Sequence, residues 1–284
     1  MKLVSFVRNG IESFGAVIDF DGVIDLRKAL GDKYINIKSV LVADALGELQ
    51  ESVIGRTADF LLSEVQLLPV IPNPGKIWCC GLNYGEHVRE TNREVNVMPT
   101  FFLRFSDSLV AHDEPIVCPK ESTMLDYEAE VAVIIGKPGR RISEQNAWDH
   151  VAGYACFNDA TIRDWQRHSQ QWGPGKNFWK TGAFGPWMVT SDEIPDNSLM
   201  TVETRLNGKV MQSSTTDKMI HSIERQIAYT STIAPLQPGD VIVTGTPGGV
   251  GARRDPPVWM KPGDRVEIIV DKIGILQNTI AAEE

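Results

Sequence analysis

The sequence has little cysteine, and its cysteines form no pattern that indicates a zinc site or a disulfide framework. The four are Cys79, Cys80, Cys118 and Cys156. Two of them are adjacent, and none has the Cys-x-x-Cys spacing that zinc sites commonly use. We therefore expect free thiols packed in the core of a protein that resides in a reducing compartment.

Long apolar runs and a surplus of basic residues are also absent. No stretch approaches the length of a membrane span, and the first residues, "MKLVSFVRNGIESFG", lack the apolar core of a signal peptide. The 28 Lys and Arg are outnumbered by 37 Asp and Glu, which gives a formal net charge of -9. Because nucleic acids and anionic membranes attract basic surfaces, we expect neither as a partner, and we expect a cytoplasmic protein.

The chain has enough apolar residues for a large core and divides at a proline-rich segment. Of its 284 residues, 42% are hydrophobic. The segment "PVIPNPG", residues 69–75, is typical of a linker. It predicts a small α+β domain over residues 1–70 and a larger domain over residues 71–284. Most segments of the larger domain have strand patterns, and Pro-Gly-Asp twice precedes a strand. This is typical of an antiparallel roll or sandwich, so the predicted fold class is α+β with mostly β structure.

Three segments carry helix signals, and one dipeptide predicts a hairpin. Residues 83–92 begin with Asn83 as a candidate N-cap and have a glutamate three residues later. Residues 143–154 begin with Ser143 in the same role. Residues 217–233 place apolar side chains on one face and end before a proline. Asn207-Gly208 predicts a tight turn between two strands.

The strand candidate "DYEAEVAVIIG", residues 126–136, has acids where a buried strand normally has none. Alternate side chains of a strand share a face, so Asp126, Glu128 and Glu130 point to one side while the apolar residues between them point into a core. Two neighbouring carboxylates on a half-buried strand repel each other and lose hydration. They must therefore be solvated, protonated, paired with cations or bound to a metal ion.

Asp159 supplies a third carboxylate. It follows the apolar run "GYACFN", where a strand ends and a loop begins. Three carboxylates without a Cys or His partner form an oxygen-only site, which suits Mg²⁺ or Mn²⁺ better than Zn²⁺ or copper. With one divalent ion the site keeps about one negative charge, so an anionic substrate needs cations nearby. The candidate cations are Arg104, Arg163, Lys176 and Lys180.

His87 and Glu90 form a candidate acid–base pair. They are three residues apart, so on a helix their side chains share a face and can touch. A carboxylate beside an imidazole fixes its tautomer and raises its basicity, as a general base for water requires. Surface pairs often have the same spacing. The glycines before the pair and the polar segment at residues 89–96 favour a mobile lid.

A glycine-rich segment, "VTGTPGGVG" at residues 243–251, is a further candidate. It lacks the Lys-Ser/Thr ending of a phosphate-binding P-loop and does not open a helix. Its glycines allow the backbone to approach a ligand closely, and Thr246 offers a hydroxyl. A plain turn between two strands is the alternative.

These segments occur in the order typical of the fumarylacetoacetate hydrolase family, which the sequence resembles from about residue 70 to residue 280. The segments that carry the resemblance are "GLNYGEHVRE", "DYEAEVAVIIG", "GYACFNDATIRDWQ", "LNGKVMQ", "PGDVIVTGTPGGVG" and "PGDRVEI". The resemblance implies a mixed β-roll, usually in a homodimer. It also implies the small N-terminal domain that many bacterial members carry.

The resemblance implies a role for each candidate residue. The implied metal ligands are Glu128, Glu130 and Asp159, the catalytic residues are His87, Glu90 and Lys176, and the substrate-binding residues are Arg104, Arg163, Gln166 and Thr246. Arg104 stands where a lysine is common in the family. Trp172 and Trp179 also depart from the family pattern in a loop that borders the pocket, so they leave the choice of substrate open.

The implied activity is cleavage of the carbon–carbon bond of a 2,4-dioxo acid by a hydrolase that uses Mg²⁺ or Mn²⁺. His87, oriented by Glu90, would activate water, and Lys176 would stabilise the oxyanion. Fumarylpyruvate or maleylpyruvate from aromatic catabolism are the expected anionic 2-oxo-acid substrates. Decarboxylation of an oxaloacetate-type acid and isomerisation or hydration of a dienoate use the same residues. A metal-binding protein without catalytic activity is the alternative from another class.

Overall fold

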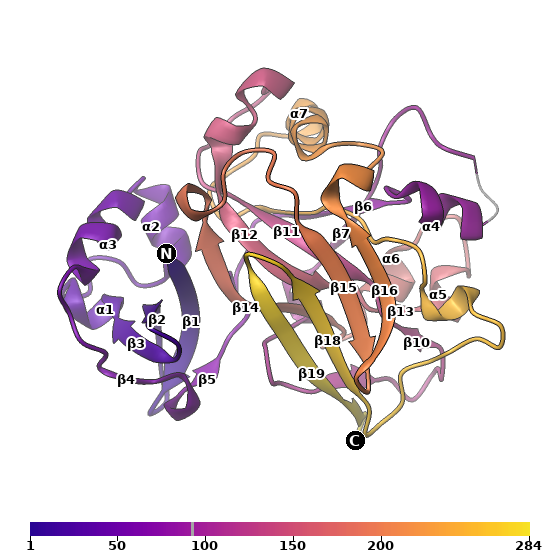
Figure 1. Ribbon diagram of the computed structural model, residues 1–284, viewed down its shortest axis with the longest axis horizontal. Helices are drawn as coiled ribbons and strands as arrows, with labels where there is room; N and C mark the ends of the chain where they lie inside the picture. The colour runs from indigo at the N-terminus through magenta and orange to yellow at the C-terminus, as the bar shows by residue number, and fades with distance from the viewer. Residues whose placement is uncertain (92–93) are drawn as a thin grey trace.

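The computed structural model describes residues 1–91 and 94–284. Their strands form two packed sheets and one separate two-stranded pair, with helices at the periphery (Figure 1). In the described residues, the large sheet has the order β4-β3-β2-β1-β14-β12-β11-β17-β6-β7, with β5 beside β1 and β8 beside β14. The smaller sheet has the order β16-β15-β18-β19-β9 and packs against β11, β12 and β14. This arrangement is the mixed β structure with few helices that the sequence predicts.

The centre of the large sheet is mostly antiparallel, with parallel pairing between β17 and β6 and between β8 and β14. Outside the N-terminal segment, the described strands of this sheet are β6 (Ile77–Gly81), β7 (Thr100–Arg104), β8 (Leu109–Val110), β11 (Ala129–Ile135), β12 (Val151–Asn158), β14 (Gly182–Thr190) and β17 (Val241–Val243). Two short strands, β10 (Leu125–Asp126) and β13 (Thr161–Ile162), pair with each other outside it.

The smaller sheet contains the predicted hairpin. Its strands are β9 (Ile116–Cys118), β15 (Thr201–Leu206), β16 (Lys209–Thr215), β18 (Arg265–Val270) and β19 (Gly274–Ala282). Asn207 and Gly208 connect β15 to β16. Both have positive φ angles, 51° at Asn207 and 77° at Gly208, as a two-residue type I′ turn requires. The hairpin prediction is confirmed.

The N-terminal segment adds strands to one side of the large sheet. It contains β1 (Lys2–Arg8), β2 (Ile11–Ile18), β3 (Gly22–Asp25), β4 (Phe60–Leu61) and β5 (Gln66–Leu67), with α1 (Leu26–Ala29), α2 (Ile37–Val42) and α3 (Leu46–Val53). Figure 1 shows this segment, in indigo, at one end of the molecule. Lys2 and Leu3 of β1 pair with Val189 and Met188 of β14, so the hydrogen-bonded sheet continues across residue 70. The division into two domains there stays a prediction.

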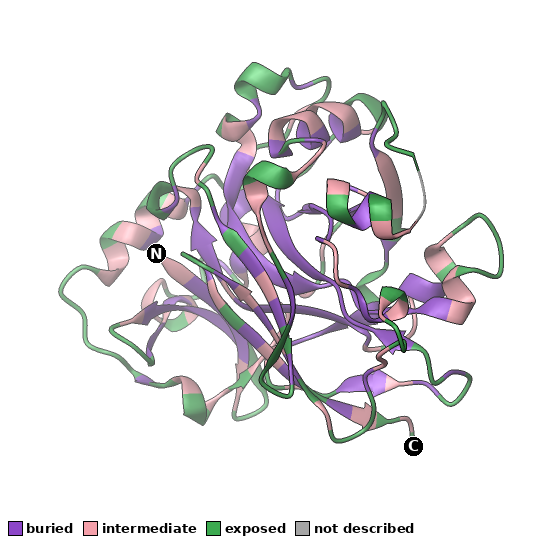
Figure 2. Ribbon diagram, turned by 45° about the vertical axis from the view of Figure 1, so that its right-hand side comes forward, coloured by how far each residue is buried: buried purple, intermediate pink, exposed green. Residues whose placement is uncertain are grey.

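Strand β11 is buried on both faces, which Figure 2 shows as purple at the centre of the molecule. Val131 and Val133 pack into the core between the two sheets. Ala132 and Ile134 pack into a second core on the other face, which includes Ile37 and other residues of the N-terminal segment. The two glutamates therefore stand at the beginning of a fully buried strand, and they are themselves almost completely buried.

One of the three predicted helices is wrong, and the other two begin later than predicted. Helix α4 (Gly85–Glu90) begins two residues after Asn83, whose side chain instead bonds His221 and the carbonyl of Thr244. The predicted helix at 143–154 is wrong: two 3-10 turns are followed by β12, because this segment pairs with β11. Helix α7 (Ile223–Ile233) confirms the third prediction with a later start, and the Ser222 side chain caps it.

Two short helices, α5 (Arg163–Gln166) and α6 (Gly173–Lys176), follow β13 and lie beside the ends of the large sheet. The predicted lid at 89–96 includes residues 92 and 93, which lie outside the described residues. In the part of the chain that is described, no helix combines the length and apolar character needed to cross a bilayer.

Candidate active site

A cavity of about 400 Å³ brings together most of the predicted site residues. Its walls come from the ends of β6 and β11, from α4, from the segment after β12 and from the glycine-rich loop. The predicted residues that line it are His87, Glu128, Glu130, Asp159, Arg163, Gln166, Lys176 and Thr246. Glu90 and Arg104 are not in its lining, but each contacts a residue that is.

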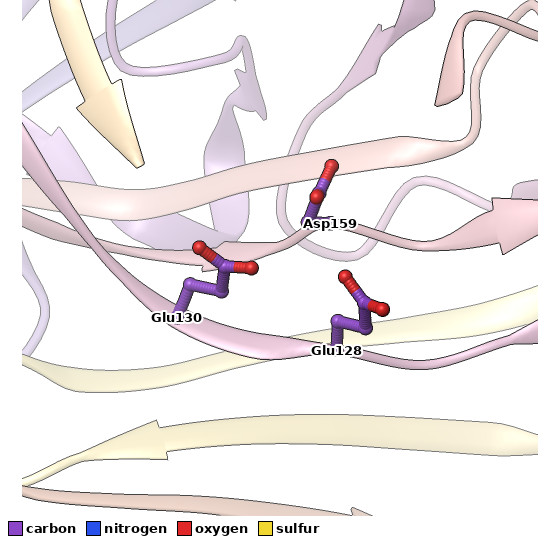
Figure 3. Close-up of side chains that lie close together, drawn as sticks. All are labelled: Glu128, Glu130 and Asp159. Atoms are coloured by element: carbon purple, nitrogen blue, oxygen red, sulfur yellow. The ribbon is translucent and has the colours of Figure 1, made fainter. Parts of the chain in front are cut away.

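Three buried carboxylates meet at one end of the cavity. Glu128, Glu130 and Asp159 each offer an oxygen atom, and these oxygens lie within 4.8 Å of one another. Ala129 pairs with Asn158 across β11 and β12, so the register sets the two glutamates beside Asp159. Figure 3 shows both glutamate side chains directed toward the aspartate. The cluster has the hard oxygen donors that Mg²⁺ and Mn²⁺ prefer.

Lys176 lies against this cluster. Its Nζ is 2.6 Å from an oxygen of Glu128 and 2.5 Å from an oxygen of Asp159. The lysine is in position because α6 packs closely on α5. A Cβ at Gly175 would overlap the backbone of Gln166, so a larger residue at 175 would separate the two helices.

Arg163 connects the cluster to a carboxylate that the sequence did not assign to the site. Its Nη2 donates to Glu128 at 2.6 Å, and its Nε donates to Asp126 at 2.7 Å. Asp126 also accepts the backbone N–H groups of Gly251 and Ala252, at 2.7 and 3.0 Å. Asp126 thus connects the end of the glycine-rich loop to the carboxylate cluster.

Arg104 lies behind the cluster and not in the cavity wall. Its guanidinium donates to Asp159 and to the carbonyl oxygen of Ala160, and its side chain is fully buried. It also donates to Thr181 at 3.0 Å. The fourth candidate cation, Lys180, is partly exposed, lies 3.9 Å from Glu114 and is not in the cavity lining.

The electrostatics of the cluster favour a further cation. Burial, together with the like charges of Asp159 and Glu128, holds the pKa of Glu130 well above its usual range. Burial acts the same way on Glu128, but Lys176 and Arg163 overcome it and lower the pKa of Glu128 to about 2. When all four carboxylates (Asp126, Glu128, Glu130 and Asp159) are ionised, the three cations (Arg104, Arg163 and Lys176) leave one negative charge without a partner. A divalent ion would reverse that sign and suit an anionic ligand.

His87 and Glu90 are in contact, as their spacing predicts. The Nδ1 atom of His87 is 2.7 Å from Glu90 Oε1, and the other Glu90 oxygen accepts the N–H of Gly249 at 2.8 Å. Nδ1 therefore carries the proton toward the carboxylate, which leaves Nε2 as an acceptor on a side chain that lines the cavity. The contact with Gly249 docks α4 on the glycine-rich loop.

Gln212 of β16 positions Thr246, and the sequence analysis missed it. Its Oε1 accepts the N–H of Ala129 at 3.0 Å, and its Nε2 donates to the carbonyl of Pro247 and to Thr246 Oγ1, both at 2.9 Å. A backbone N–H only donates and a carbonyl only accepts, so the amide orientation is fixed. Thr246 Oγ1 is then an acceptor toward Gln212, and its own proton is available to the cavity.

One tryptophan of the two that depart from the family pattern borders the cavity. Trp172 lines it and packs edge-on against Phe102, with the ring centroids 5.7 Å apart. A Cβ at Gly81 would overlap the Trp172 ring, so the glycine makes room for it. Trp179 is 59% exposed and lines a neighbouring aromatic groove instead.

The chain belongs to the fumarylacetoacetate hydrolase family. The family model for the fumarylacetoacetate hydrolase C-terminal region matches residues 76–281. This confirms the resemblance found in the sequence, and it covers all the candidate site residues.

Relatives of several activities are similar to this chain. A mitochondrial oxaloacetate tautomerase of Xenopus laevis is 43% identical over 220 residues, which are 77% of this chain and 69% of the relative. The structure of a fumarylacetoacetate hydrolase from Exiguobacterium antarcticum has a TM-score of 0.88 and 33% identity, and covers 100% of both chains. That of a maleylpyruvate hydrolase from Sphingobium sp. SYK-6, in complex with manganese(II) and pyruvate, has a TM-score of 0.83 and 27% identity over 100% of both chains.

Proposed function

We propose that this protein moves a proton between carbon and oxygen of a 2-oxo acid, with the keto–enol interconversion of oxaloacetate as its reaction. The observation that carries the proposal is the His87–Glu90 pair at 2.7 Å, beside a buried carboxylate cluster in one cavity. The 43% identical relative is named as an oxaloacetate tautomerase. The similar structure with manganese and pyruvate supports a metal ion and a 2-oxo acid as the ligands.

Glu128, Glu130 and Asp159 would hold the divalent ion. Their oxygen donors and the excess negative charge of the cluster fit Mg²⁺ or Mn²⁺. The bound ion would stabilise negative charge that develops on the oxo oxygen. Lys176 contributes a fixed positive charge at the same place. Burial lowers its pKa, but Asp159 and Glu128 more than offset this and raise the pKa above its ordinary value, so the ammonium stays protonated.

His87 would carry the proton. Its Nε2 takes a proton from the carbon next to the oxo group, the C–H bonding pair becomes the carbon–carbon double bond, and the carbonyl pair moves onto oxygen. The imidazolium then returns the proton to that oxygen, which gives the enol and a neutral imidazole. Glu90 stabilises the imidazolium and keeps Nε2 directed at the cavity.

Hydrolysis of an acylpyruvate is the second candidate. It is favoured by the similar maleylpyruvate hydrolase structure, which covers the whole chain. The same histidine would take its proton from water instead of carbon, and Lys176 would face the resulting oxyanion. A tautomerase needs no water at the site, whereas this reaction does.

Spectrophotometry on purified protein with Mn²⁺ tests both candidates. We expect faster loss of the enol absorbance of oxaloacetate than in buffer with Mn²⁺ alone, without release of pyruvate, and we expect EDTA to abolish the effect. His87→Ala should lower the rate by about 10²- to 10⁴-fold while calorimetry still detects Mn²⁺ binding, and His150→Ala serves as the control outside the cavity. Pyruvate from fumarylpyruvate or maleylpyruvate, with no effect on oxaloacetate, would instead identify a hydrolase.

A further inference from the structure

The inner cations of the cavity are already paired with carboxylates of the protein. Arg163 bonds Asp126 and Glu128, and Lys176 bonds Glu128 and Asp159, all at 2.7 Å or less. They offset part of the negative charge of the carboxylate cluster. A second negative charge on the substrate, away from the metal ion, therefore needs a different partner.

Two further arginines line the same cavity. Arg253 follows the glycine-rich loop, and Arg167 follows α5, so they come from separate segments of the chain. Both are exposed. Among the described residues, none of the arginine ion pairs involves Arg253.

The backbone around Arg253 is anchored although its side chain is exposed. The two residues before it donate their N–H groups to Asp126, which is fully buried. The residue after it, Arg254, donates to Tyr127 Oη at 3.1 Å and to the carbonyl of Gly249 at 3.2 Å. Arg253 is thus held at the cavity by buried contacts on both sides and is not on a freely moving loop.

We infer that Arg253, assisted by Arg167, binds a second carboxylate of the substrate and selects 2-oxo dicarboxylic acids over monocarboxylic ones. The inference rests on the proposed function in that the ligand is a 2-oxo acid. It applies equally to a tautomerase and to a hydrolase. A guanidinium suits this role because its parallel N–H groups match the geometry of a carboxylate.

Binding of two non-reacting 2-hydroxy acids, measured by calorimetry on the Mn²⁺-loaded protein, tests the inference. Malate and 2-hydroxybutanoate differ by the distal carboxylate, which is a methyl group in the second. In Arg253→Gln we expect malate to bind about fivefold to tenfold more weakly and 2-hydroxybutanoate to change less than about twofold. Arg253→Lys should recover part of the loss. Arg56→Gln, an exposed arginine of the N-terminal segment, is the matched control for net charge.

The outcomes separate the inference from the proposed function. If Arg253→Gln weakens both ligands equally, or neither, Arg253 does not read the second carboxylate and the inference is wrong. If malate binding depends on Arg253 but the protein turns over no 2-oxo acid, the proposed function fails while the binding site stands. If oxaloacetate is turned over with an unchanged KM in Arg253→Gln, the function stands and the inference falls.

Discussion

At the scale of single residues, the fixed amide of Gln212 connects separate parts of the site. It joins the backbone between the two glutamates to the loop that carries Thr246. The groups that bond to Gln212 are all buried. When the Gln212 side chain is changed, each of these groups loses a hydrogen bond that bulk water does not replace. Its contribution is to stability and to the direction of the Thr246 hydroxyl.

We expect Gln212→Glu to destabilise the protein more than Gln212→Leu. The leucine leaves buried partners unsatisfied, which costs about 1–3 kcal/mol in the free energy of unfolding. The glutamate adds a buried carboxylate that faces the carbonyl of Pro247 and approaches a cluster already rich in negative charge. Urea unfolding of both variants without metal measures the difference. Equal losses of unfolding free energy in the two variants would show that a charge at position 212 does not interact with the carboxylate cluster.

His112 should make stability depend on pH. Burial lowers its pKa; Asp113, 3.4 Å from its Nε2, opposes this and Arg265 adds to it. Its Nδ1 accepts the N–H of Gln277 at 3.0 Å, so the neutral form fits the fold. Because the pKa is lower in the folded state, the unfolded state binds more protons as the pH falls below about 6.5, and stability falls with it.

We therefore expect His112→Asn to lose less stability than the wild type between about pH 7 and pH 5, because an asparagine oxygen can still accept the Gln277 N–H. Thermal unfolding at a series of pH values measures the difference in stability between the two proteins. The titration of the other groups is the same in both and cancels in this difference. Parallel curves would show that His112 does not titrate in this range.

At the scale of elements, α4 and the glycine-rich loop act as a unit. Glu90 bonds both His87 and the Gly249 backbone, so the acid–base pair is aligned only while α4 is docked. The fit is close, because a Cβ at Gly248 would lie 3.0 Å from the Glu86 Cβ. The position of α4 against the loop therefore sets the geometry of the proposed acid–base pair.

Gly248→Ala should displace α4 and lower kcat by about tenfold, which corresponds to about 1.4 kcal/mol in the barrier, while Mn²⁺ still binds. The double variant Gly248→Ala/Glu86→Gly removes the atom that the new methyl group meets, so we expect it to regain part of the rate. Steady-state kinetics of both variants test this. No recovery in the double variant would mean that the alanine acts on the loop itself and not through α4.

Elements that depend on local sequence pattern could be predicted from the sequence. Features that depend on contacts between residues far apart in the sequence could not. The period of the strand predicted that Glu128 and Glu130 share a side, and the Asn207-Gly208 turn has its own local geometry. By contrast, Asn83 does not cap α4, because His221 and Thr244, which are 138 and 161 positions away, form three hydrogen bonds with its side chain. Asp126 and Gln212 were missed for the same reason, since their partners are remote in sequence.

At the scale of the whole molecule, the excess negative charge of the buried carboxylate cluster should make the stability of the fold depend on metal binding. With Mn²⁺ at about one hundred times its Kd, binding to the folded state adds about 2.7 kcal/mol to stability. For a chain of this length we expect a rise in Tm of about 5–10 °C over the EDTA-treated protein. Differential scanning calorimetry with and without Mn²⁺ measures it.

Glu130→Gln is the matched variant, because a glutamine oxygen can still accept the N–H of Gly245 that Glu130 accepts. It removes one of the crowded charges, so we expect a higher Tm than the wild type in EDTA and little further rise with Mn²⁺. A full rise with Mn²⁺ in this variant would remove Glu130 from the set of ligands.

The homodimer and the cytoplasmic location implied at the start stay predictions. The aromatic groove beside the cavity, with exposed Phe105 and Trp179, is an apolar surface of the kind that contacts between protein chains use. The N-terminal segment shares both its sheet and a core with the rest of the chain. We therefore expect residues 71–284 alone to expose apolar surface when the segment is removed.

The packing of Trp172 on Gly81 limits how this protein can change over evolutionary time. Both residues border the cavity, and any side chain at 81 would collide with the indole. A lineage that exchanges the tryptophan for a smaller residue gains freedom at 81, whereas one that first acquires alanine at 81 must lose the tryptophan or its orientation. Positions 81 and 172 should therefore covary among homologues, and the order of the two substitutions should determine which new substrate ranges can be reached.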